Sequence, residues 1–166
     1  MTSRHARLRN WLINIGMILA AYLAIQLIQT RDAPTSGPAP AFSGQLLDGR
    51  NISLADYRGQ PVLLHFWATW CTVCRIEQGS IDNIAKDHAV IAVASQSGSR
   101  AQVREVVQRR GITVPVLVDE NGALASLYGI KAYPTSFVID ARGQIHDVEV
   151  GYTSELGLRA RLASAD

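Results

Sequence analysis

The chain has 166 residues, of which 48% are hydrophobic and 18% are charged, and its formal net charge at pH 7 is +2. This length and composition fit one globular domain with an additional apolar segment outside it. The positive charge comes largely from arginines near the N-terminus, and no basic stripe interleaved with aromatic residues occurs elsewhere. The sequence therefore gives no support to nucleic acid binding.

The longest apolar run covers residues 11–28, with the sequence WLINIGMILAAYLAIQLI and no charged residue. As a helix it would be about 27 Å long, enough to cross the hydrocarbon core of a bilayer. Because arginines precede it, the positive-inside rule leaves residues 1–10 in the cytoplasm. The sequence predicts a transmembrane anchor at residues 11–29 and a single-pass inner-membrane location, with the remainder in the periplasm or an equivalent extracytoplasmic space.

A cleaved signal peptide is the alternative, since a basic start followed by an apolar stretch also marks secretion signals. The run is longer than the usual apolar core of a signal peptide, and no small-x-small cleavage motif closes it. A retained anchor is therefore the favoured interpretation. Under both interpretations the rest of the chain is exported.

Residues 30–40 are rich in Pro, Gly, Ser and Thr, a composition typical of an extended spacer. The globular domain is then expected at residues 41–166. It opens with two short segments, residues 45–47 and 51–54, on either side of Asp48-Gly49, a dipeptide suited to a tight turn. This pattern predicts a small N-terminal β-hairpin.

The next segments alternate between buried strands and helices. The almost continuous apolar runs at residues 62–67 and 89–94 are typical of strands covered on both faces. One helix is predicted between these runs, from Cys71 to about residue 87, and a second at residues 100–110. This strand–helix–strand–helix order predicts a parallel sheet core.

The last third of the chain predicts a shorter strand at residues 116–118, a helix at 123–128 and an antiparallel hairpin with strands at 136–140 and 144–150. A final helix at residues 154–163 closes the chain. Together these segments predict an α/β domain with a central mixed sheet, flanking helices and an N-terminal hairpin extension.

Both cysteines lie in the stretch Trp70-Cys71-Thr72-Val73-Cys74, directly after the first buried strand. If Cys71 caps the following helix, the two cysteines lie about one turn apart on one helix face, close enough to form a disulfide. Unpaired backbone N–H groups and the helix dipole there lower the pKa of a thiol from its free value of about 8.5. Cys71 is therefore the expected nucleophile, and the more shielded Cys74 would resolve the mixed disulfide.

The same two thiols allow other roles. A structural disulfide that closes so short a loop constrains the unfolded chain little and would stabilise the domain poorly. A zinc site needs two more ligands. The four histidines show no paired spacing: His5, His65, His88 and His146. No metal site is therefore predicted, but thiolates select Cu(I), so a copper chaperone stays open even though Met1 and Met17 lie outside the folded domain.

Five stretches of the domain together carry a family signature. They are Phe66-Trp67-Ala68-Thr69-Trp70-Cys71, Cys74-Arg75-Ile76-Glu77-Gln78-Gly79-Ser80-Ile81, Tyr128-Gly129-Ile130, Pro134-Thr135-Ser136-Phe137 and Val150-Gly151-Tyr152-Thr153. They resemble the membrane-anchored TlpA/ResA/DsbE branch of the thioredoxin superfamily, and within it the ScsD-type proteins named for suppression of copper sensitivity. The resemblance extends over nearly all of residues 41–163 and implies a thioredoxin-like fold preceded by one transmembrane helix.

The resemblance also implies a substrate-binding surface around the cysteines. Pro134 matches the cis-proline that faces the disulfide in thioredoxin-like proteins, where the backbone of the preceding residue, here Tyr133, pairs with the substrate strand. An ordinary X-Pro bond is usually trans, so the expectation of a cis bond comes from the family alone. The substrate-binding residues implied in this way are Trp70, Thr72, Val73, Tyr133, Pro134 and Thr135.

Glu77 lies three residues after Cys74, on the same side of the predicted helix. Its position alone favours a solvent-facing glutamate on a surface helix. The resemblance instead implies a proton acceptor for Cys74, because a glutamate at this spacing is tied to redox activity in the ResA and DsbE proteins. Glu77 is therefore included with Cys71 and Cys74 among the predicted catalytic residues.

Three residues depart from the family pattern. Thr72 replaces a frequent proline after the first cysteine, and Gly79 replaces the helix-kinking proline of many thioredoxins. His65 occupies the strand position where thioredoxins carry a buried acid. The favoured interpretation of His65 is a plain strand residue whose ring is satisfied by the backbone, and the alternative is a role in proton movement.

The predicted function is that of an exported, membrane-tethered thiol:disulfide oxidoreductase acting on proteins, with the Cys71–Cys74 pair as its redox couple and no separate cofactor. The resemblance implies reduction, with electrons from a transmembrane dithiol carrier of the DsbD or CcdA kind. It also implies substrates in copper tolerance or in cytochrome c maturation, where haem-attachment cysteines must be reduced.

A thiol peroxidase is a further alternative, because residues 47–59 also resemble the start of peroxiredoxin domains. Those enzymes place a threonine or serine three residues before the peroxidatic cysteine and a proline seven residues before it. Here the two positions hold Ala68 and Leu64. The departure weighs against peroxidase chemistry.

Overall fold

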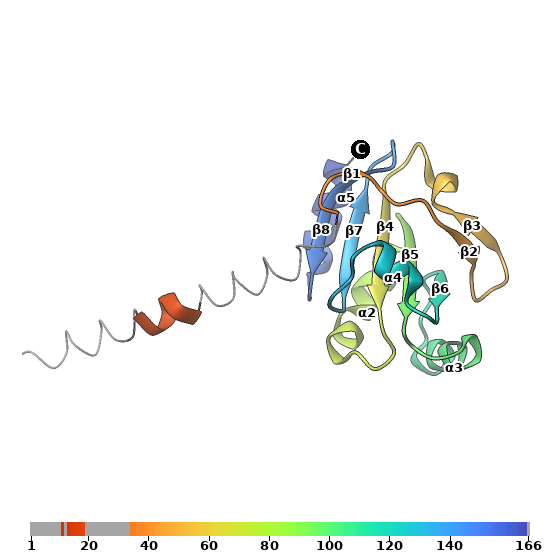
Figure 1. The fold of residues 1–166 in the computed structure, drawn as a ribbon, viewed down its shortest axis with the longest axis horizontal. Coiled ribbons are helices and arrows are strands. Elements are labelled where there is room, and N and C mark those ends of the chain that lie inside the picture. Colours follow the sequence, from red (N-terminus) through yellow and green to blue (C-terminus); the bar gives the residue numbers. More distant parts are fainter. Residues whose placement is uncertain (1–10, 12, 19–33, 166) are drawn as a thin grey trace, which may run out of the picture.

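The computed structural model describes residues 11, 13–18 and 34–165 (Figure 1). The predicted cytoplasmic segment at residues 1–10 and most of the predicted anchor at residues 11–29 lie outside the described residues. Among the helices that are described, none has the length and apolar character needed to span a bilayer.

The domain is built on a six-stranded mixed sheet with the strand order β1-β8-β7-β4-β5-β6 (Figure 1). The strands are β1 (Gly37–Pro38), β4 (Val62–Trp67), β5 (Ala89–Ser95), β6 (Val116–Asp119), β7 (Thr135–Ile139) and β8 (Gln144–Val150). β4, β5 and β6 run parallel to one another, whereas β7 pairs antiparallel with β4 and β8 pairs antiparallel with β7. The predicted parallel core and the predicted C-terminal antiparallel hairpin are therefore both confirmed.

Helices cover both faces of this sheet, as expected for strands that read as continuous apolar runs. The helices are η1 (Leu54–Tyr57), α2 (Thr72–Ile84), α3 (Arg100–Arg110), α4 (Ala123–Leu127) and α5 (Glu155–Ser164). Side chains of α2, α3 and α5 pack in one core cluster with Leu63 and Trp67 of β4. The alternate β4 residues Leu64 and Phe66 face the other cluster, under α4 and the N-terminal hairpin.

The N-terminal hairpin forms a separate two-stranded sheet of β2 (Ser43–Gln45) and β3 (Asn51–Ser53). Its first strand lies two residues earlier than predicted, and the buried Leu46 that follows it bridges to Leu117 of β6. The turn at Asp48-Gly49 is confirmed, with Gly49 at a φ of 95° that glycine adopts without strain.

The sheet also includes two residues, 37 and 38, that lie inside the spacer predicted at residues 30–40. Gly37 and Pro38 pair with Ile145 and Gln144 at the edge of β8. The Tyr128 hydroxyl, in a fully buried side chain, donates to the Pro40 carbonyl at 2.6 Å. The edge strand β8 offers unpaired backbone groups that this segment satisfies, so a composition typical of spacers forms part of the fold here.

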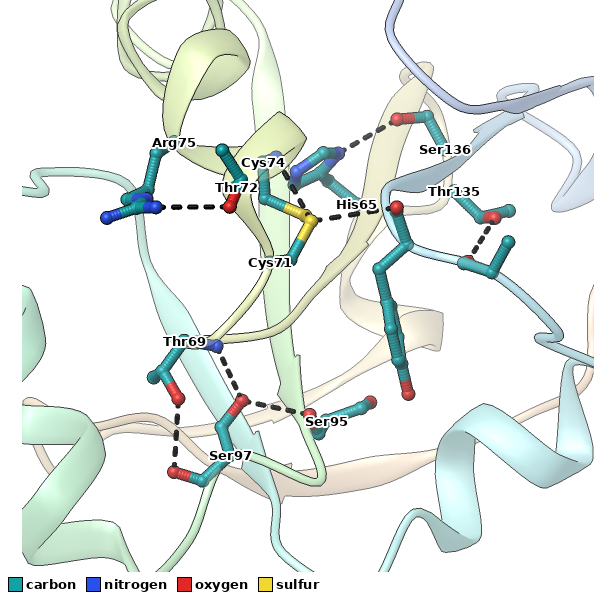
Figure 2. Close-up of a disulfide and its surroundings, with 12 residues drawn as sticks. His65, Thr69, Cys71, Thr72, Cys74, Arg75, Ser95, Ser97, Thr135 and Ser136 are labelled. Atoms are coloured by element: carbon teal, nitrogen blue, oxygen red, sulfur yellow. Dashed lines mark hydrogen bonds between the residues drawn. A yellow bond between two sulfur atoms is a disulfide. The ribbon is translucent and has the colours of Figure 1, made fainter.

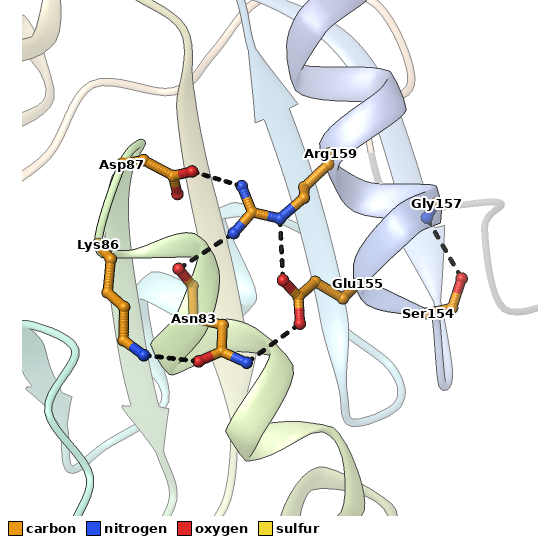
Figure 3. A network of polar contacts seen from close by, with 7 residues as sticks. All are labelled: Asn83, Lys86, Asp87, Ser154, Glu155, Gly157 and Arg159. Atoms are coloured by element: carbon orange, nitrogen blue, oxygen red, sulfur yellow. Dashed lines mark hydrogen bonds and ion pairs between the residues drawn. The ribbon is translucent and has the colours of Figure 1, made fainter.

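α5 packs across the C-terminal half of α2, and a polar network fixes the contact (Figure 3). The Arg159 guanidinium donates to Glu155 within α5 at 2.9 Å and to Asp87, just beyond α2, at 2.8 Å. It also donates to the Asn83 carbonyl at 3.2 Å. This contact places the C-terminal helix beside the helix that carries the cysteines.

Candidate active site

The cysteine pair lies where β4 turns into α2. Cys71 is the N-cap of α2, and its sulfur accepts a hydrogen bond from the Cys74 backbone N–H at 3.1 Å. The two cysteines form a disulfide with their Cα atoms 5.4 Å apart, which confirms that this spacing allows a bridge. Cys71 is 7% exposed and Cys74 only 1%. Cys71 is therefore the sulfur more open to a partner.

The loop before Cys71 is anchored to the end of β5. Thr69 donates its backbone N–H to the Ser97 hydroxyl at 2.9 Å, and that hydroxyl donates to the Ser95 carbonyl at 2.9 Å (Figure 2). The Trp70 indole N–H donates to the Gln96 carbonyl at 3.0 Å. These bonds fix the loop to the end of β5, while Trp70 remains 62% exposed beside the disulfide.

The segment before β7 faces the disulfide from the other side. The Tyr133–Pro134 peptide bond is cis, as the family resemblance implied. The Tyr133 carbonyl oxygen lies 3.6 Å from the Cys71 sulfur, and the Tyr133 ring packs edge-on against Trp70. The structure thus brings Trp70, Tyr133 and Pro134 together around Cys71.

The remaining predicted substrate-binding residues differ in accessibility. Thr72 and Val73, in the first turn of α2, are exposed next to the disulfide. Thr135 is only 2% exposed, and its hydroxyl donates to the Ala132 carbonyl at 2.9 Å. Its side chain supports the turn around Pro134 and does not reach the accessible surface.

Glu77 is buried, so the interpretation of a solvent-facing glutamate is wrong. The side chain is 1% exposed and shares the buried face of α2 with Cys74. Its Oε1 accepts the Thr153 backbone N–H at 3.1 Å, whereas its Oε2 is buried and has no hydrogen-bond partner. Burial raises the pKa of Glu77 to about 7, and the charge of Glu149 adds to this against the opposing Thr153 hydrogen bond. A carboxyl with this pKa can take up and release a proton near neutral pH.

No sequence pattern assigned Glu149 or Arg161 to the surroundings of the cysteines. Glu149 of β8 accepts the Thr153 hydroxyl at 3.4 Å, so Thr153 bonds to both glutamates. Arg161 of α5 forms ion pairs with Glu149 and with Asp147. Only the packing of β8 and α5 against α2 brings these charges close to the cysteine helix.

His65 lies on the same face of β4 as Leu63 and Trp67, the face that packs against the cysteine helix. Its ring nitrogen Nδ1 lies 2.9 Å from the Ser136 hydroxyl, so a side chain and not the backbone satisfies the ring (Figure 2). Its other nitrogen, Nε2, is buried without a hydrogen-bond partner. Burial lowers the pKa of His65 to about 4, which keeps the ring neutral near physiological pH.

Metal binding receives no support from the clustering of side chains. Within residues 34–165 and the short described helix before them, no three His, Cys, Asp or Glu side chains gather as a set that could hold a metal ion. The cysteine pair is the group in this region with redox chemistry of its own.

Comparison with known proteins decides the family. The model of the AhpC/TSA family matches residues 35–148, most of the domain just described. The chain belongs to the AhpC/TSA family of thioredoxin-like proteins.

Among curated relatives of this AhpC/TSA protein is the thioredoxin-like protein YneN of Bacillus subtilis, 36% identical over 93% of this chain and 98% of the relative. The thiol-disulfide oxidoreductase ResA of Geobacillus thermodenitrificans is 30% identical over 76% of this chain and 75% of the relative. Among solved structures, the thiol:disulfide interchange protein DsbE of Chlorobium tepidum has a TM-score of 0.72 at 28% identity, covering 80% of this chain and 98% of that one.

The relatives and the site geometry agree on the chemistry. This AhpC/TSA protein is a thioredoxin-like thiol-disulfide oxidoreductase of the ResA/DsbE type, with a close Cys-x-x-Cys pair. The predicted thioredoxin-like fold and the predicted enzyme class are both confirmed.

Proposed function

We propose that this protein reduces disulfides of exported proteins, with Cys71 as the nucleophile, Cys74 as the resolving thiol and Glu77 as the proton acceptor for Cys74. The observation that carries the proposal is the asymmetry of the pair. Cys71 sits at the helix N-terminus beside the exposed Trp70, whereas Cys74 is buried on the same helix face as a carboxyl whose pKa lies near 7.

The reaction starts from the dithiol form. The Cys71 thiolate attacks a substrate disulfide, forms a mixed disulfide with one substrate sulfur and expels the other as a thiolate. Cys74 then transfers its proton to Glu77 and attacks the Cys71 sulfur, which expels the second substrate thiolate. Two electrons and, after protonation of the products, two protons pass to the substrate. No separate cofactor takes part.

The cycle closes when a second dithiol reduces the Cys71–Cys74 disulfide. We assign this role to a transmembrane dithiol carrier of the DsbD or CcdA kind, with the enzyme held at the membrane by the apolar segment at residues 11–29 and its domain outside the cytoplasm. The ScsD-like stretches favour partner proteins of copper tolerance over haem-attachment cysteines of cytochrome c maturation as substrates.

Trapping tests the proposal. In full-length protein, Cys71→Ala should abolish reduction of a peptide disulfide, because the accessible nucleophile is lost. Cys74→Ala should accumulate mixed disulfides through Cys71, which non-reducing electrophoresis and mass spectrometry detect and whose partners identify the substrates. Full activity of the Cys71→Ala variant would defeat the assignment. Rapid consumption of hydrogen peroxide, or tight Cu(I) binding without peptide reduction, would point to the peroxidase or the copper chaperone.

A further inference from the structure

Two arginines flank the cysteine motif on the side away from the cis-proline turn. Arg75, directly after Cys74, donates to the Thr72 hydroxyl at 3.1 Å, and Figure 2 shows it across the cysteines from Thr135 and Ser136. Arg110, the last residue of α3, donates to the Thr69 carbonyl at 2.8 Å. Each guanidinium thus donates one of its five N–H groups to a residue beside the cysteines, Arg75 to Thr72 and Arg110 to Thr69.

The two side chains line one pocket. Its volume is about 390 Å³, and its lining consists of Arg75, Gln78, Gly79, Asp82 and Arg110. Burial lowers the pKa of Arg110 below its usual value, and the charges of Arg75 and Arg109 add to that effect. Among the residues that the structure describes, neither Arg75 nor Arg110 has an ion-pair partner.

Asp82, the one acidic residue in the lining of this pocket, already accepts hydrogen bonds from other residues. The Asp82 Oδ1 accepts the backbone N–H groups of Thr113 and Val114, each at 2.9 Å, and the Thr113 hydroxyl at 3.1 Å. Its Oδ2 accepts the Gln78 amide at 3.3 Å. Asp82 thus fixes the connection between α3 and β6, and the lining as a whole remains positive.

We propose that this pocket binds the carboxylate of an aspartate or glutamate in the substrate polypeptide, close to the cysteine that bonds to Cys71. This inference rests on the proposed function and names its substrate class. A guanidinium matches a carboxylate through two parallel N–H donors. The exposed Ile76, 68% accessible, and Val73, 41% accessible, offer apolar contact to the same chain on the outer face of α2. Space for the carboxylate exists at Gly79, where an added Cβ would meet no atom of another element within 4 Å.

A matched pair of substrates tests the proposal. Two peptides, each carrying a disulfide-linked reporter thiol, have identical sequences except for glutamate or glutamine at two positions near the cysteine. We expect wild-type, full-length protein to reduce the acidic peptide with a kcat/KM about twofold to fivefold higher, the range that exposed ion pairs provide. The ratio should approach one at high ionic strength, because salt screens exposed charges.

Variants test whether the two arginines cause the preference for the acidic peptide. The double variant Arg75→Gln/Arg110→Gln should bring the ratio to about one, and Gly79→Leu should lower it by filling the pocket while both charges remain. Arg109→Gln is the matched control, because Arg109 carries the same charge on α3 but pairs with Glu105 at 3.1 Å. Its ratio should stay at the wild-type value. Circular dichroism and the rate with the glutamine peptide report whether each variant is folded.

The outcomes separate this inference from the proposed function. A wild-type ratio of one, a ratio that survives in the double variant, or an equal loss in Arg109→Gln would overturn the carboxylate pocket while the reductase function stands. If wild-type protein reduces neither peptide, the proposed function fails first.

Discussion

At the scale of single residues, burial shifts the pKa values of two titratable groups near the cysteines, Glu77 and His65, in opposite directions. The same loss of solvation raises the pKa of the Glu77 carboxyl to about 7 and lowers that of the His65 ring to about 4. Glu77 therefore changes charge near neutral pH, whereas His65 stays neutral. This difference supports the proposal that the buried carboxyl accepts the proton of Cys74.

We predict that Glu77→Gln slows resolution of the mixed disulfide on the order of 100-fold, the contribution expected of a positioned general base. In wild-type protein the resolution rate should rise as pH increases through about 7, since Glu77 accepts a proton only when ionised. Stopped-flow measurement of product release across pH 5–9 checks both effects. Glu105 of α3, an exposed glutamate that pairs with Arg109, supplies the control Glu105→Gln. An unchanged pH profile in Glu77→Gln would remove Glu77 from the mechanism.

At the scale of elements, β8 and α5 adjust the environment of a residue that belongs to α2. Thr153, in the connection between β8 and α5, bonds to both Glu77 and Glu149, and Arg161 pairs with Glu149 from α5. The Glu149 charge raises the pKa of Glu77, and Arg161 forms an ion pair with Glu149. The C-terminal helix thus contacts, through Arg161, the carboxylate whose charge raises the pKa of Glu77.

We predict opposite shifts when either partner of this pair is neutralised. Arg161→Gln should move the midpoint of the pH–rate profile upward by about half a pH unit, because Glu149 then acts on Glu77 without compensation. Glu149→Gln should move it downward by a similar amount. Measurements of the resolution rate against pH give both midpoints.

Arg159→Gln is the control for this comparison. Arg159 lies on the same helix and carries the same charge, but it pairs with Asp87 and Glu155 at the other end of α2 (Figure 3). Its loss should leave the midpoint in place. Equal shifts in Arg159→Gln and Arg161→Gln would show a general charge effect and contradict the specific path through Glu149.

At the scale of the whole molecule, the two buried groups make the folding stability depend on pH in opposite directions. Glu77 binds its proton more tightly in the folded state, so stability is lost as pH rises from about 4.5 to about 7. His65 binds its proton less tightly when folded, so stability is lost as pH falls from about 6.5 to about 4. Each contribution reaches about 3 kcal/mol when fully developed.

We predict that Glu77→Gln gains stability over wild type at pH 8 and loses this advantage by pH 4. His65→Asn should show the reverse trend, with its relative stability improving as pH falls from 7 to 4. Urea unfolding of the oxidised, full-length proteins at each pH measures the differences, in which contributions from the other titrating groups cancel. Parallel curves for wild type and either variant would contradict the burial that these pKa values reflect.

Much of the fold was predictable because its signals are local. The runs at residues 62–67 and 89–94 predicted strands covered on both faces, and the Asp48-Gly49 pair marked its turn. The edge pairing of Gly37 and Pro38 was not predictable, because it depends on unpaired groups of β8 more than 100 residues later in the chain.

The sequence by itself determined the fold class and the redox pair, since strand periodicity and the spacing of Cys71 and Cys74 follow from neighbouring residues. Only the tertiary structure decided that Glu77 is buried, that His65 pairs with Ser136 and that Thr153 and Arg161 link Glu149 to the surroundings of Glu77. The physical reason is that solvation and Coulomb energies depend on what packs around a group in space, and elements distant in sequence supply those neighbours.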